Sequence, residues 1–247
     1  MQRGFRFHFP EIPSTNSWVR RHAPKLPSDS ISLVTATQQT AARGRLARRW
    51  HAPPAGNLYS SFFLTVGLNR IDVANLPQVL ALSVASVLKM QRAQVRFKWP
   101  NDLLIEDKKV AGILTETVRL PNRLGVVIGI GLNVNMGEEE LSKIDRPATS
   151  LAVSEGHSFD LASLISSLFQ QFSTDCQQFL DQGFRPFRAQ LEALSAYRRG
   201  DPIAFTNDAQ TWRGLYHSIH SDGSLNIVLD GDATIRTFHA GEIVQYG

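Results

Sequence analysis

Two short apolar runs separated by a charged turn restrict the fold more than any other feature of this sequence. They occupy residues 103–114 (LLIEDKKVAGIL), and the turn falls at Glu106 to Lys108. Apolar runs on either side of so short a polar break predict a β-hairpin, whose two strands are antiparallel. Such a hairpin argues against a doubly wound parallel sheet, in which crossover helices separate the strands.

Further strand and helix candidates surround the hairpin. β-branched and aromatic residues predict strands at residues 31–37, 57–66, 95–99, 109–118 and 124–134. Apolar residues at helical spacing predict helices at residues 72–91, 160–181 and 186–196. Because strands and helices alternate irregularly, we predict an α+β fold with a mixed β-sheet flanked by helices.

After Tyr197 the sequence changes to short alternating runs. Turn residues separate these runs at Asn207-Asp208, Asp222-Gly223 and Asp230-Gly231. This pattern is typical of a small all-β module. The stretch RRGDP at residues 198–202 gives a natural boundary, so we predict two domains, residues 1–196 and residues 197–247.

Composition narrows the class of protein. Hydrophobic residues make up 43% and charged residues 19% of the 247, as in an ordinary globular protein, and a formal charge of +4 is too mild for a nucleic-acid coat. The single cysteine, Cys176, cannot form an internal disulfide, and the histidines lack the spacing of a structural zinc site. No apolar run approaches a signal-peptide core or the roughly 20 residues that span a bilayer. We therefore expect a soluble, cytoplasmic protein without membrane contact.

Four arginines and one glycine, with no acidic residue, end the stretch QTAARGRLARRW at residues 39–50. Because this stretch lies between two predicted strands, we expect a loop in which Gly44 lets a bound group approach the backbone. Alternation places Arg43 and Arg45 on one side, and guanidinium groups match carboxylate and phosphate oxygens. The loop is a candidate site for a ligand that carries both groups. A solvated basic turn and a contact to RNA phosphates remain open as alternatives.

A second polar stretch, KWPND, occupies residues 98–102. Pro100 fixes its own φ, so that Asn101 and Asp102 are presented together, and their oxygens could hold a magnesium ion that bridges to nucleotide phosphates. A plain turn is the alternative. Lys109 could neutralise a phosphate or a carboxylate, or it could simply be exposed. The stretch IGIGLNVN at residues 128–135 lacks the third glycine and the following helix of a dinucleotide-binding fingerprint.

In order and approximate spacing, these stretches resemble the motifs of biotin-protein ligases. The motifs are STN at residues 14–16, Q-x-x-x-R-G-R-x-x-R-x-W at 39–50, KWPND at 98–102, K-x-A-G-I-L at 109–114 and G-x-G-L-N-V-N at 129–135. The resemblance covers essentially the whole chain, including ATSL at residues 148–151 and the C-terminal module. Ala42, Leu46 and Ala47 stand where the family usually has glycine or more polar residues, which predicts a stiffer loop.

The resemblance implies an ATP-dependent ligase that works in two steps. The carboxylate of biotin attacks the α-phosphate of ATP, with Mg2+ as cofactor, to give biotinyl-5′-AMP and pyrophosphate. A lysine of the biotin carboxyl carrier protein of acetyl-CoA carboxylase then attacks the mixed anhydride. The implied fold is a catalytic domain like that of class II aminoacyl-tRNA synthetases, followed by a small C-terminal Src-homology-3-like β-barrel. Because only 13 residues precede Ser14, we expect a monofunctional ligase without DNA-binding domain, repressor activity or nucleic-acid partner; a homodimer is left open.

The resemblance also implies roles for single residues. Expected contacts to biotin come from Ser14, Thr15, Asn16, Gln39, Arg43, Gly44, Arg45, Trp50, Lys109 and Gly112. Expected contacts to the nucleotide come from Arg45, Arg48, Asn101, Lys109 and Asn133, and Asn101 is the candidate Mg2+ ligand. The expected catalytic residues are Arg43, Arg45, Lys109 and Asp102. Asp102 would orient the acceptor lysine, whose amine, with a free pKa of about 10.4, must lose a proton before it attacks.

Two other functions stay open. A lipoate or octanoate ligase on the same fold would need an apolar tunnel where the ureido ring of biotin needs polar partners. A non-catalytic RNA-binding protein could use the arginine loop, although the sequence offers few interleaved aromatic residues for base stacking. Trp99 is expected in the core, and Trp50 is expected beside the ligand or beneath the loop.

Overall fold

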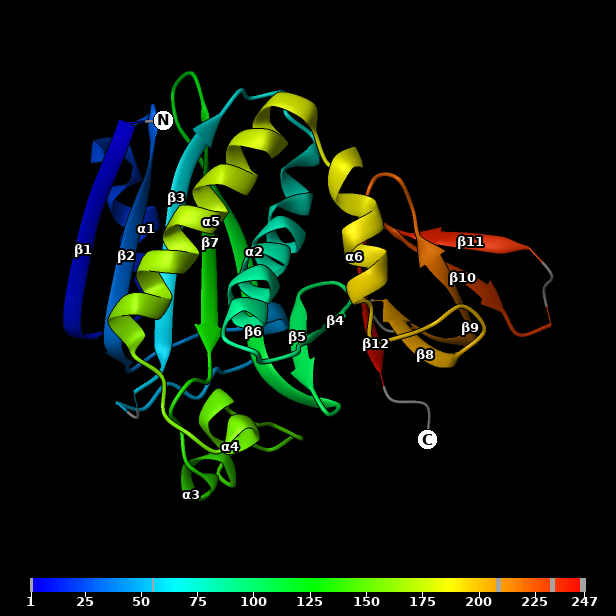
Figure 1. Ribbon diagram of the computed structural model, residues 1–247. Coiled ribbons are helices and arrows are strands. Elements are labelled where there is room, and N and C mark those ends of the chain that lie inside the picture. Colours follow the sequence, from blue (N-terminus) through cyan, green and yellow to red (C-terminus); the bar gives the residue numbers. More distant parts are fainter. Residues whose placement is uncertain (1, 55, 208–209, 232–233, 245–247) are drawn as a thin grey trace.

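The computed structural model describes residues 2–54, 56–207, 210–231 and 234–244. Its main element is a seven-stranded sheet with the order β1-β2-β3-β7-β6-β5-β4 (Figure 1). β1 and β2 are parallel and the other neighbouring pairs are antiparallel, so the sheet is mixed and the predicted fold class is confirmed. The strands are β1 (Gln2–Ile12), β2 (Ser30–Gln39), β3 (Leu58–Val66), β4 (Arg96–Lys98), β5 (Asp102–Ile105), β6 (Lys108–Arg119) and β7 (Leu124–Leu132).

The predicted hairpin joins β5 and β6. Glu106 and Asp107 have φ angles of 48° and 62°, in the left-handed region that two-residue hairpin turns require. The ladder pairs Asp102 directly with Gly112. The turn, together with a one-residue register shift between Leu103 and Leu104, therefore fixes the position of Asp102 on the sheet.

β1, at one edge of the sheet, is a strand that was not predicted. The alternating stretch FRFHF at residues 5–9 turns Phe7 and Phe9 to one face. Their rings lie 5.0 Å and 5.4 Å from that of Trp18 on α1 (Thr15–His22). The alternation that defines this strand was therefore present in the sequence.

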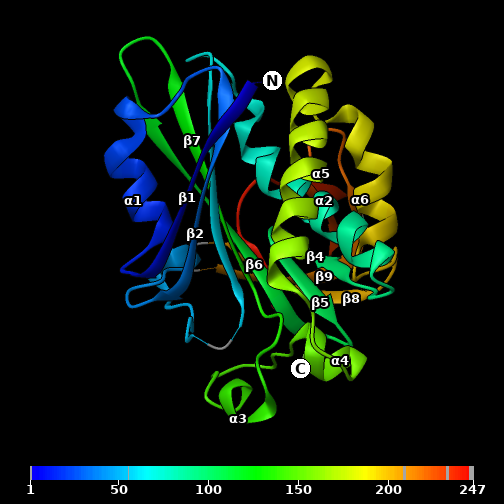
Figure 2. The same cartoon turned by 60° about the vertical axis from the view of Figure 1, so that its left-hand side comes forward.

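Helices cover the two faces of the sheet unequally (Figure 2). The long helices α2 (Leu76–Met90) and α5 (Leu161–Gln182) pack over one face, as the helical spacing predicted, and α1 lies on the other. Burial raises the pKa of Cys176 on α5 to about 12, as expected of a small buried hydrophobic residue. The shorter helices are α3 (Glu138–Leu141), α4 (Leu151–Glu155) and α6 (Arg188–Leu194), with 3-10 turns at Ala23–Lys25, Arg45–Ala47, Asp72–Asn75 and Arg185–Phe187.

Residues Asp72–Met90 form one helical stretch that is long and apolar enough to cross a membrane. The expectation that no segment approaches this length was wrong by that criterion. However, Leu76, Val79 and Leu80 are completely buried in the main core. Because a core helix has the same composition as a membrane span, this stretch is explained by its place between the sheet and α5.

The C-terminal module is a five-stranded antiparallel sheet with the order β11-β10-β9-β8-β12. Its loop at residues 221–224 docks on the main core, where the carbonyl of Gly223 accepts from Gln78 Nε2 at 2.8 Å and from Trp99 Nε1 at 3.1 Å. Trp99 is thus buried, as expected. Residues 245–247 of the second predicted domain, and Asp208 of a predicted turn, lie outside the described residues. The strands are β8 (Pro202–Asn207), β9 (Gln210–Ile219), β10 (Leu225–Leu229), β11 (Ile235–Phe238) and β12 (Glu242–Val244).

Candidate active site

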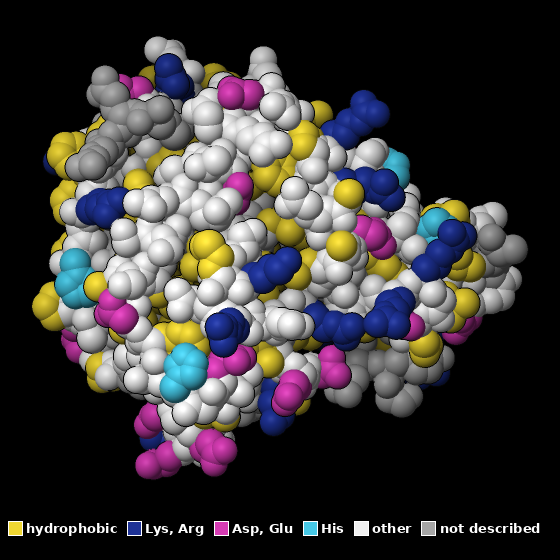
Figure 3. Space-filling model, viewed as in Figure 1, with side chains coloured by type: hydrophobic (Ala, Val, Ile, Leu, Met, Phe, Trp, Pro, Cys, Tyr) yellow, Lys and Arg dark blue, Asp and Glu magenta, His cyan; other side chains and the backbone are white. Residues whose placement is uncertain are grey.

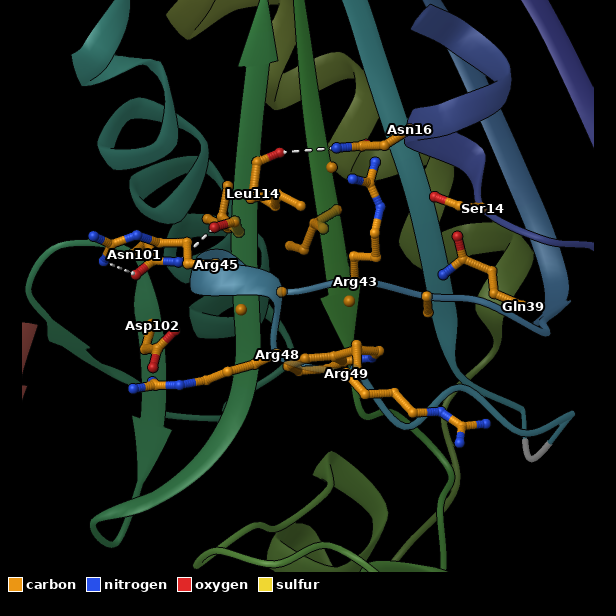
Figure 4. A pocket seen from close by; sticks show the side chains of 18 of the residues that line it. Ser14, Asn16, Gln39, Arg43, Arg45, Arg48, Arg49, Asn101, Asp102 and Leu114 are labelled. Carbon is orange, nitrogen blue, oxygen red and sulfur yellow. Dashed lines mark hydrogen bonds between the residues drawn. The ribbon is translucent and has the colours of Figure 1, made fainter.

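A pocket lies on the face of the main sheet that carries α1 (Figure 4). The start of α1, the arginine loop at residues 40–50 and strands β5, β6 and β7 line it. Every residue that the sequence predicted for the site lines this pocket except Asn133, which lines an adjoining one. The fold therefore brings together segments that are far apart along the chain.

The arginine loop folds back on itself. The Gly44 N–H donates to the carbonyl of Arg48 at 2.7 Å. At the tip, Leu46 and Ala47 have φ angles of 54° and 58°, which costs an L-residue roughly 1–2 kcal/mol. The loop is thus already formed in this structure, and its tip carries backbone strain at two of the positions where the sequence departs from the family pattern.

Arg43 and Arg45 both line the pocket, but they reach toward different parts of it (Figure 4). Arg43 Nη2 lies 3.2 Å from a carboxylate oxygen of Glu116 on β6. Arg45 donates to Asn101 Oδ1 at 3.2 Å and to the carbonyl of Gly241 at 3.1 Å. Burial lowers the pKa of Arg45, and nearby carboxylates oppose this shift. The cavity therefore holds two separated guanidinium groups, rather than a pair on one side of an extended loop.

Arg48 is bound by the C-terminal module, a contact that was not predicted. Glu242, the first residue of β12, accepts from Arg48 Nη1 at 2.7 Å and from Nη2 at 2.5 Å. Hydrogen bonding within the pair raises the pKa of Arg48 and lowers that of Glu242. In Figure 4 the guanidinium of Arg48 points toward Asp102. The C-terminal module therefore closes one side of the pocket by a paired arginine–carboxylate contact.

Lys109 and Asp102 form an ion pair inside the pocket. Lys109 Nζ lies 2.6 Å from Asp102 Oδ1, and the two side chains are only 20% and 23% exposed. The same Nζ lies 5.4 Å from the centre of the Trp50 ring, within cation–π range. The ammonium of Lys109 has three N–H donors, so an anionic ligand can bind it beside Asp102 or in place of Asp102. Displacement of Asp102 would release a carboxylate that is then able to accept a proton.

Asn101 does not present a free oxygen to a metal ion. Its Oδ1 accepts from Arg45, and its Nδ2 donates to the carbonyl of Ile113 at 2.5 Å. Within the residues that the structure describes, no group of three or more His, Cys, Asp or Glu side chains could hold a metal. Magnesium needs several oxygen ligands in near-octahedral geometry. The residues present therefore do not fit a magnesium ion held by the protein.

The start of α1 contributes polar groups to one end of the pocket. Ser14 caps the helix by accepting from the Ser17 N–H at 3.3 Å. The Thr15 N–H donates to Gln39 Oε1 at 2.8 Å, and Thr15 Oγ1 donates to the same oxygen at 3.2 Å. These bonds fix the oxygen end of the Gln39 amide. The Nε2 end of Gln39 and the hydroxyl proton of Ser14 are then the groups best placed to meet a ligand.

Asn16 is held by the protein itself. Its Nδ2 donates to the carbonyl of Leu114 at 3.2 Å and to Glu116 Oε2 at 3.0 Å, and its Oδ1 lies 2.6 Å from Ser61 Oγ. Ser61 Oγ also lies 2.7 Å from Thr15 Oγ1. Because these hydrogen-bonding groups are already used, the side chains of Thr15 and Asn16 shape the pocket more directly than they offer contacts to biotin.

Three glycines form the floor of the pocket, and only Gly112 was predicted for the site. A Cβ atom on Gly129 would lie 2.2 Å from Asn16 Oδ1, and one on Gly131 would lie 2.4 Å from the Trp50 ring. Gly112 is paired directly with Gly131 and would also meet Trp50, at 2.9 Å. Gly129 and Gly131 thus leave room on one face of β7 for the side chains of Asn16 and Trp50. The sequence alone does not show that these distant segments pack against the two glycines.

A second pocket adjoins the first across Trp50 and Lys109, which line both. Asn133 is 2% exposed there, and its Nδ2 donates to the carbonyl of Thr149 at 3.0 Å, whereas its Oδ1 has no hydrogen-bond partner. Trp50 Nε1 is also buried without a partner. An unpaired buried polar atom costs roughly 1–3 kcal/mol, so a ligand that satisfied it would bind more tightly.

Comparisons with known proteins identify the family of this chain. Residues 8–133 match the Biotin/lipoate A/B protein ligase family. The chain is 32% identical to the biotin--[acetyl-CoA-carboxylase] ligase of Paracoccus denitrificans, over 93% of this chain and 96% of that protein. It is 30% identical to the bifunctional ligase/repressor BirA of Escherichia coli strain K12, over 95% of this chain and 72% of that protein.

A solved structure extends the likeness to the whole fold. The biotin protein ligase from Aquifex aeolicus in complex with biotin and ATP superposes with a TM-score of 0.81 at 26% identity, over 97% of each chain. The chain therefore belongs to the biotin/lipoate A/B protein ligase family and is an enzyme of the biotin protein ligase type.

Proposed function

We propose that this chain uses ATP to attach biotin to a specific lysine of a biotin carboxyl carrier protein, through a biotinyl-5′-AMP intermediate. The observation that carries the proposal is the position of Lys109, which lines two adjoining pockets at once. One pocket would hold biotin and the other the nucleotide, so that the ammonium stands where their two anionic ends meet. The names of the relatives and of the Aquifex aeolicus complex support both substrates.

Biotin would bind in the first pocket with its ureido ring toward α1. The Ser14 hydroxyl and the Gln39 amide supply hydrogen-bonding groups at that end, and Leu114 supplies apolar surface. The carboxylate would then extend toward Lys109 and Arg45. Polar groups at the closed end favour a ureido ring over the apolar chain of lipoate or octanoate, because a buried polar group left unpaired costs free energy.

ATP would bind with its base in the second pocket. The unpaired Asn133 Oδ1 can accept a hydrogen bond from the amino group of adenine, and the Trp50 ring offers an aromatic surface for the base. Lys109, Arg45 and Arg48 would then surround the phosphates. Arg48 can take part only after it leaves Glu242.

In the first step an oxygen of the biotin carboxylate would form a bond to the α-phosphorus, and the bond from that phosphorus to the bridging oxygen would break. Two anions must meet for this to happen. Lys109 and Arg45 would lower their repulsion, and the enclosed pocket strengthens such charge interactions. In the second step the nitrogen of the acceptor lysine would form a bond to the anhydride carbonyl carbon, and the bond from that carbon to the phosphate oxygen would break, so that AMP leaves. Asp102, released from Lys109, would take the proton of the amine.

The prediction that Mg2+ accompanies ATP remains untested. Because Asn101 is bound to Arg45 and Asp102 to Lys109, the ion would have to arrive with the phosphates of ATP. A requirement of activity for added Mg2+ would support this prediction. The predicted division at residues 196 and 197, the cytoplasmic location and any homodimer likewise stay predictions.

The direct test is transfer of labelled biotin to a biotin carboxyl carrier domain. We expect ATP-dependent transfer by the wild type and a loss of roughly 100-fold or more in Arg45→Ala and Lys109→Ala, because each removes a charge from the reacting centre. Lys108→Ala, at an exposed neighbouring position, is the matched control and should transfer biotin normally. Equal activity in all four proteins would contradict the proposal.

The same proteins distinguish the alternatives. Adenylate formation with lipoate or octanoate but not biotin would point to a different acid within the family. Strong, salt-sensitive RNA binding without biotin-dependent turnover would favour the RNA-binding function.

On the face seen in Figure 3, Lys and Arg side chains are scattered and acidic side chains gather over α3, where Glu138, Glu139 and Glu140 lie. Specific binding of operator DNA would contradict the prediction that this chain is not a repressor.

A further inference from the structure

A third cavity adjoins the active site on the side of the C-terminal module. Asp102 and Lys109 line it as well as the first pocket, so the two spaces meet at this ion pair. Lys98, at the end of β4, also lines it. Because Lys98 pairs directly with Asp102 across the β4–β5 ladder, the two side chains project from the same face of the sheet.

Positive charge is in excess around this cavity. Its lining includes four basic side chains and three acidic ones, namely Arg48, Lys98, Lys109, Arg146, Asp102, Asp107 and Glu242. Asp102 is already paired with Lys109, and Glu242 with Arg48. In the described part of the chain Lys98 has no ion-pair partner within 4.0 Å. Lys98 is therefore a cation in the wall of this cavity without a bound counter-charge.

The environment of Lys98 favours binding of an anion. Burial lowers the pKa of Lys98, and the nearby charge of Asp102 opposes this shift. A partly buried ammonium group without an ion-pair partner has lost part of its hydration, and no close negative charge replaces those lost interactions. An anion with several oxygens would restore that lost interaction.

We propose that this cavity receives the pyrophosphate that leaves ATP, and that Lys98 binds it directly. The proposal rests on the proposed function, since only adenylation produces this leaving group. When the bond between the α-phosphorus and the bridging oxygen breaks, its electron pair stays on that oxygen and the leaving pyrophosphate gains negative charge. Lys98 would neutralise part of that charge without any proton transfer. Arg48 could join it by exchanging the carboxylate of Glu242 for phosphate oxygens.

The cavity is less suited to the other substrate that must reach this centre, the acceptor lysine. That lysine arrives as an ammonium ion at neutral pH. Lys98, which has no ion-pair partner among the described residues, would repel it, while the carboxylates of Asp102 and Glu242 are already paired. Excess positive charge attracts pyrophosphate and discourages an amine.

The test separates the two half-reactions in Lys98→Met, with Lys108→Met as the matched control on the exposed start of β6. Biotin-dependent exchange of labelled pyrophosphate into ATP reports on the first step, and transfer from purified biotinyl-5′-AMP to a carrier domain reports on the second. For Lys98→Met we expect the KM for pyrophosphate to rise about tenfold or more, because one charge-assisted contact is lost. Transfer from the preformed adenylate should stay within about twofold of the wild type.

Several outcomes decide the matter. Partial recovery of pyrophosphate affinity in Lys98→Arg would support a direct charge contact. Unchanged exchange in Lys98→Met, or slower transfer with normal exchange, would overturn the proposal and assign Lys98 to another role. If Lys98→Met lowers the unfolding midpoint, Lys98→Gln is measured in its place, because glutamine keeps a polar group in the cavity. The expected changes in pyrophosphate exchange and in transfer are the same. Failure of exchange in the wild type itself would count against the proposed function instead.

Discussion

The indole ring of Trp50 lies across Gly131 so closely that a Cβ atom on this glycine would fall 2.4 Å from the ring. Trp50 stands at the junction of the two pockets, with Lys109 Nζ 5.4 Å from its ring centre. The glycine therefore sets the height of the ring above the sheet. The position of the ring in turn fixes one wall of the space proposed for ATP.

Gly131→Ala should weaken ATP binding by displacing this ring. A contact below 3.0 Å cannot be relieved without movement, and the rigid indole must shift as a unit. We expect the KM for ATP to rise about tenfold, with a smaller effect on biotin, and a change in tryptophan fluorescence. Gly137→Ala is the control, since a Cβ there would have nothing within 4 Å. An unchanged KM for ATP in Gly131→Ala would show that the ring is not part of the nucleotide site.

Asp102→Asn should separate the two steps. The amide cannot accept the proton of the acceptor lysine, so transfer from preformed biotinyl-5′-AMP should fall about 100-fold at neutral pH. Because the amine deprotonates by itself as pH approaches its pKa of about 10.4, the loss should shrink as pH rises. Adenylation should be affected less, because Lys109 keeps its charge. Asp107→Asn, exposed in the turn of the same hairpin, should transfer normally, and a pH-independent loss in Asp102→Asn would rule out the proton-accepting role.

The sequence contained the local features of this fold more fully than the contacts between distant segments. The β5–β6 hairpin, the α2 and α5 helices and the Ser14 cap follow from short patterns, and they agree with the structure. β1 was missed although its phenylalanines alternate, because its charged and polar residues obscure the apolar face. The Arg48–Glu242 contact joins residues 194 positions apart, and no local pattern predicts such a pair.

The same limit applies to the site. The family resemblance implied which side chains would gather, and these side chains line one pocket or its neighbour. They did not predict that Thr15 and Asn16 are bound within the protein, or that Asn101 faces Arg45 rather than a metal. Those outcomes depend on partners from other strands and loops, which are fixed only when the sheet forms.

Ala47→Gly should relax the tip of the arginine loop. Ala47 has a φ angle of 58°, and glycine adopts this region at no steric cost. However, ordering a glycine costs about 0.5–1 kcal/mol more conformational entropy than ordering an alanine. The balance favours glycine by up to about 1 kcal/mol, so the KM for ATP should fall by at most about fivefold. Ala41→Gly, on an exposed residue near the start of the loop, lacks this benefit and should not improve binding. A weaker affinity in Ala47→Gly would mean that stiffness of the loop contributes more than its strain costs.

Glu242→Gln should loosen the contact between the arginine loop and the C-terminal module in a pH-dependent way. Hydrogen bonds from Arg48 hold the pKa of Glu242 below its ordinary value. A group whose pKa is lowered on folding stabilises the protein above its unfolded pKa, and this contribution is lost as pH falls through the folded value. At neutral pH the wild type should therefore have the higher unfolding midpoint. Because Arg48 is 44% exposed, solvent screening limits the difference to roughly 1 kcal/mol or less.

That difference should shrink as pH falls below the ordinary pKa of a glutamate and vanish once pH lies below the lowered pKa of Glu242 in the folded protein, where the wild-type carboxyl group is protonated as well. Freed from Glu242, Arg48 should also meet the phosphates more readily, and the KM for ATP in Glu242→Gln should fall by up to about fivefold at neutral pH. Unfolding midpoints measured from neutral to acidic pH, beside ATP titrations, check both effects. Glu138→Gln, exposed on α3, is the control for removal of one negative charge. A rise in the KM for ATP would show that Glu242 positions Arg48 for the nucleotide instead of competing with it.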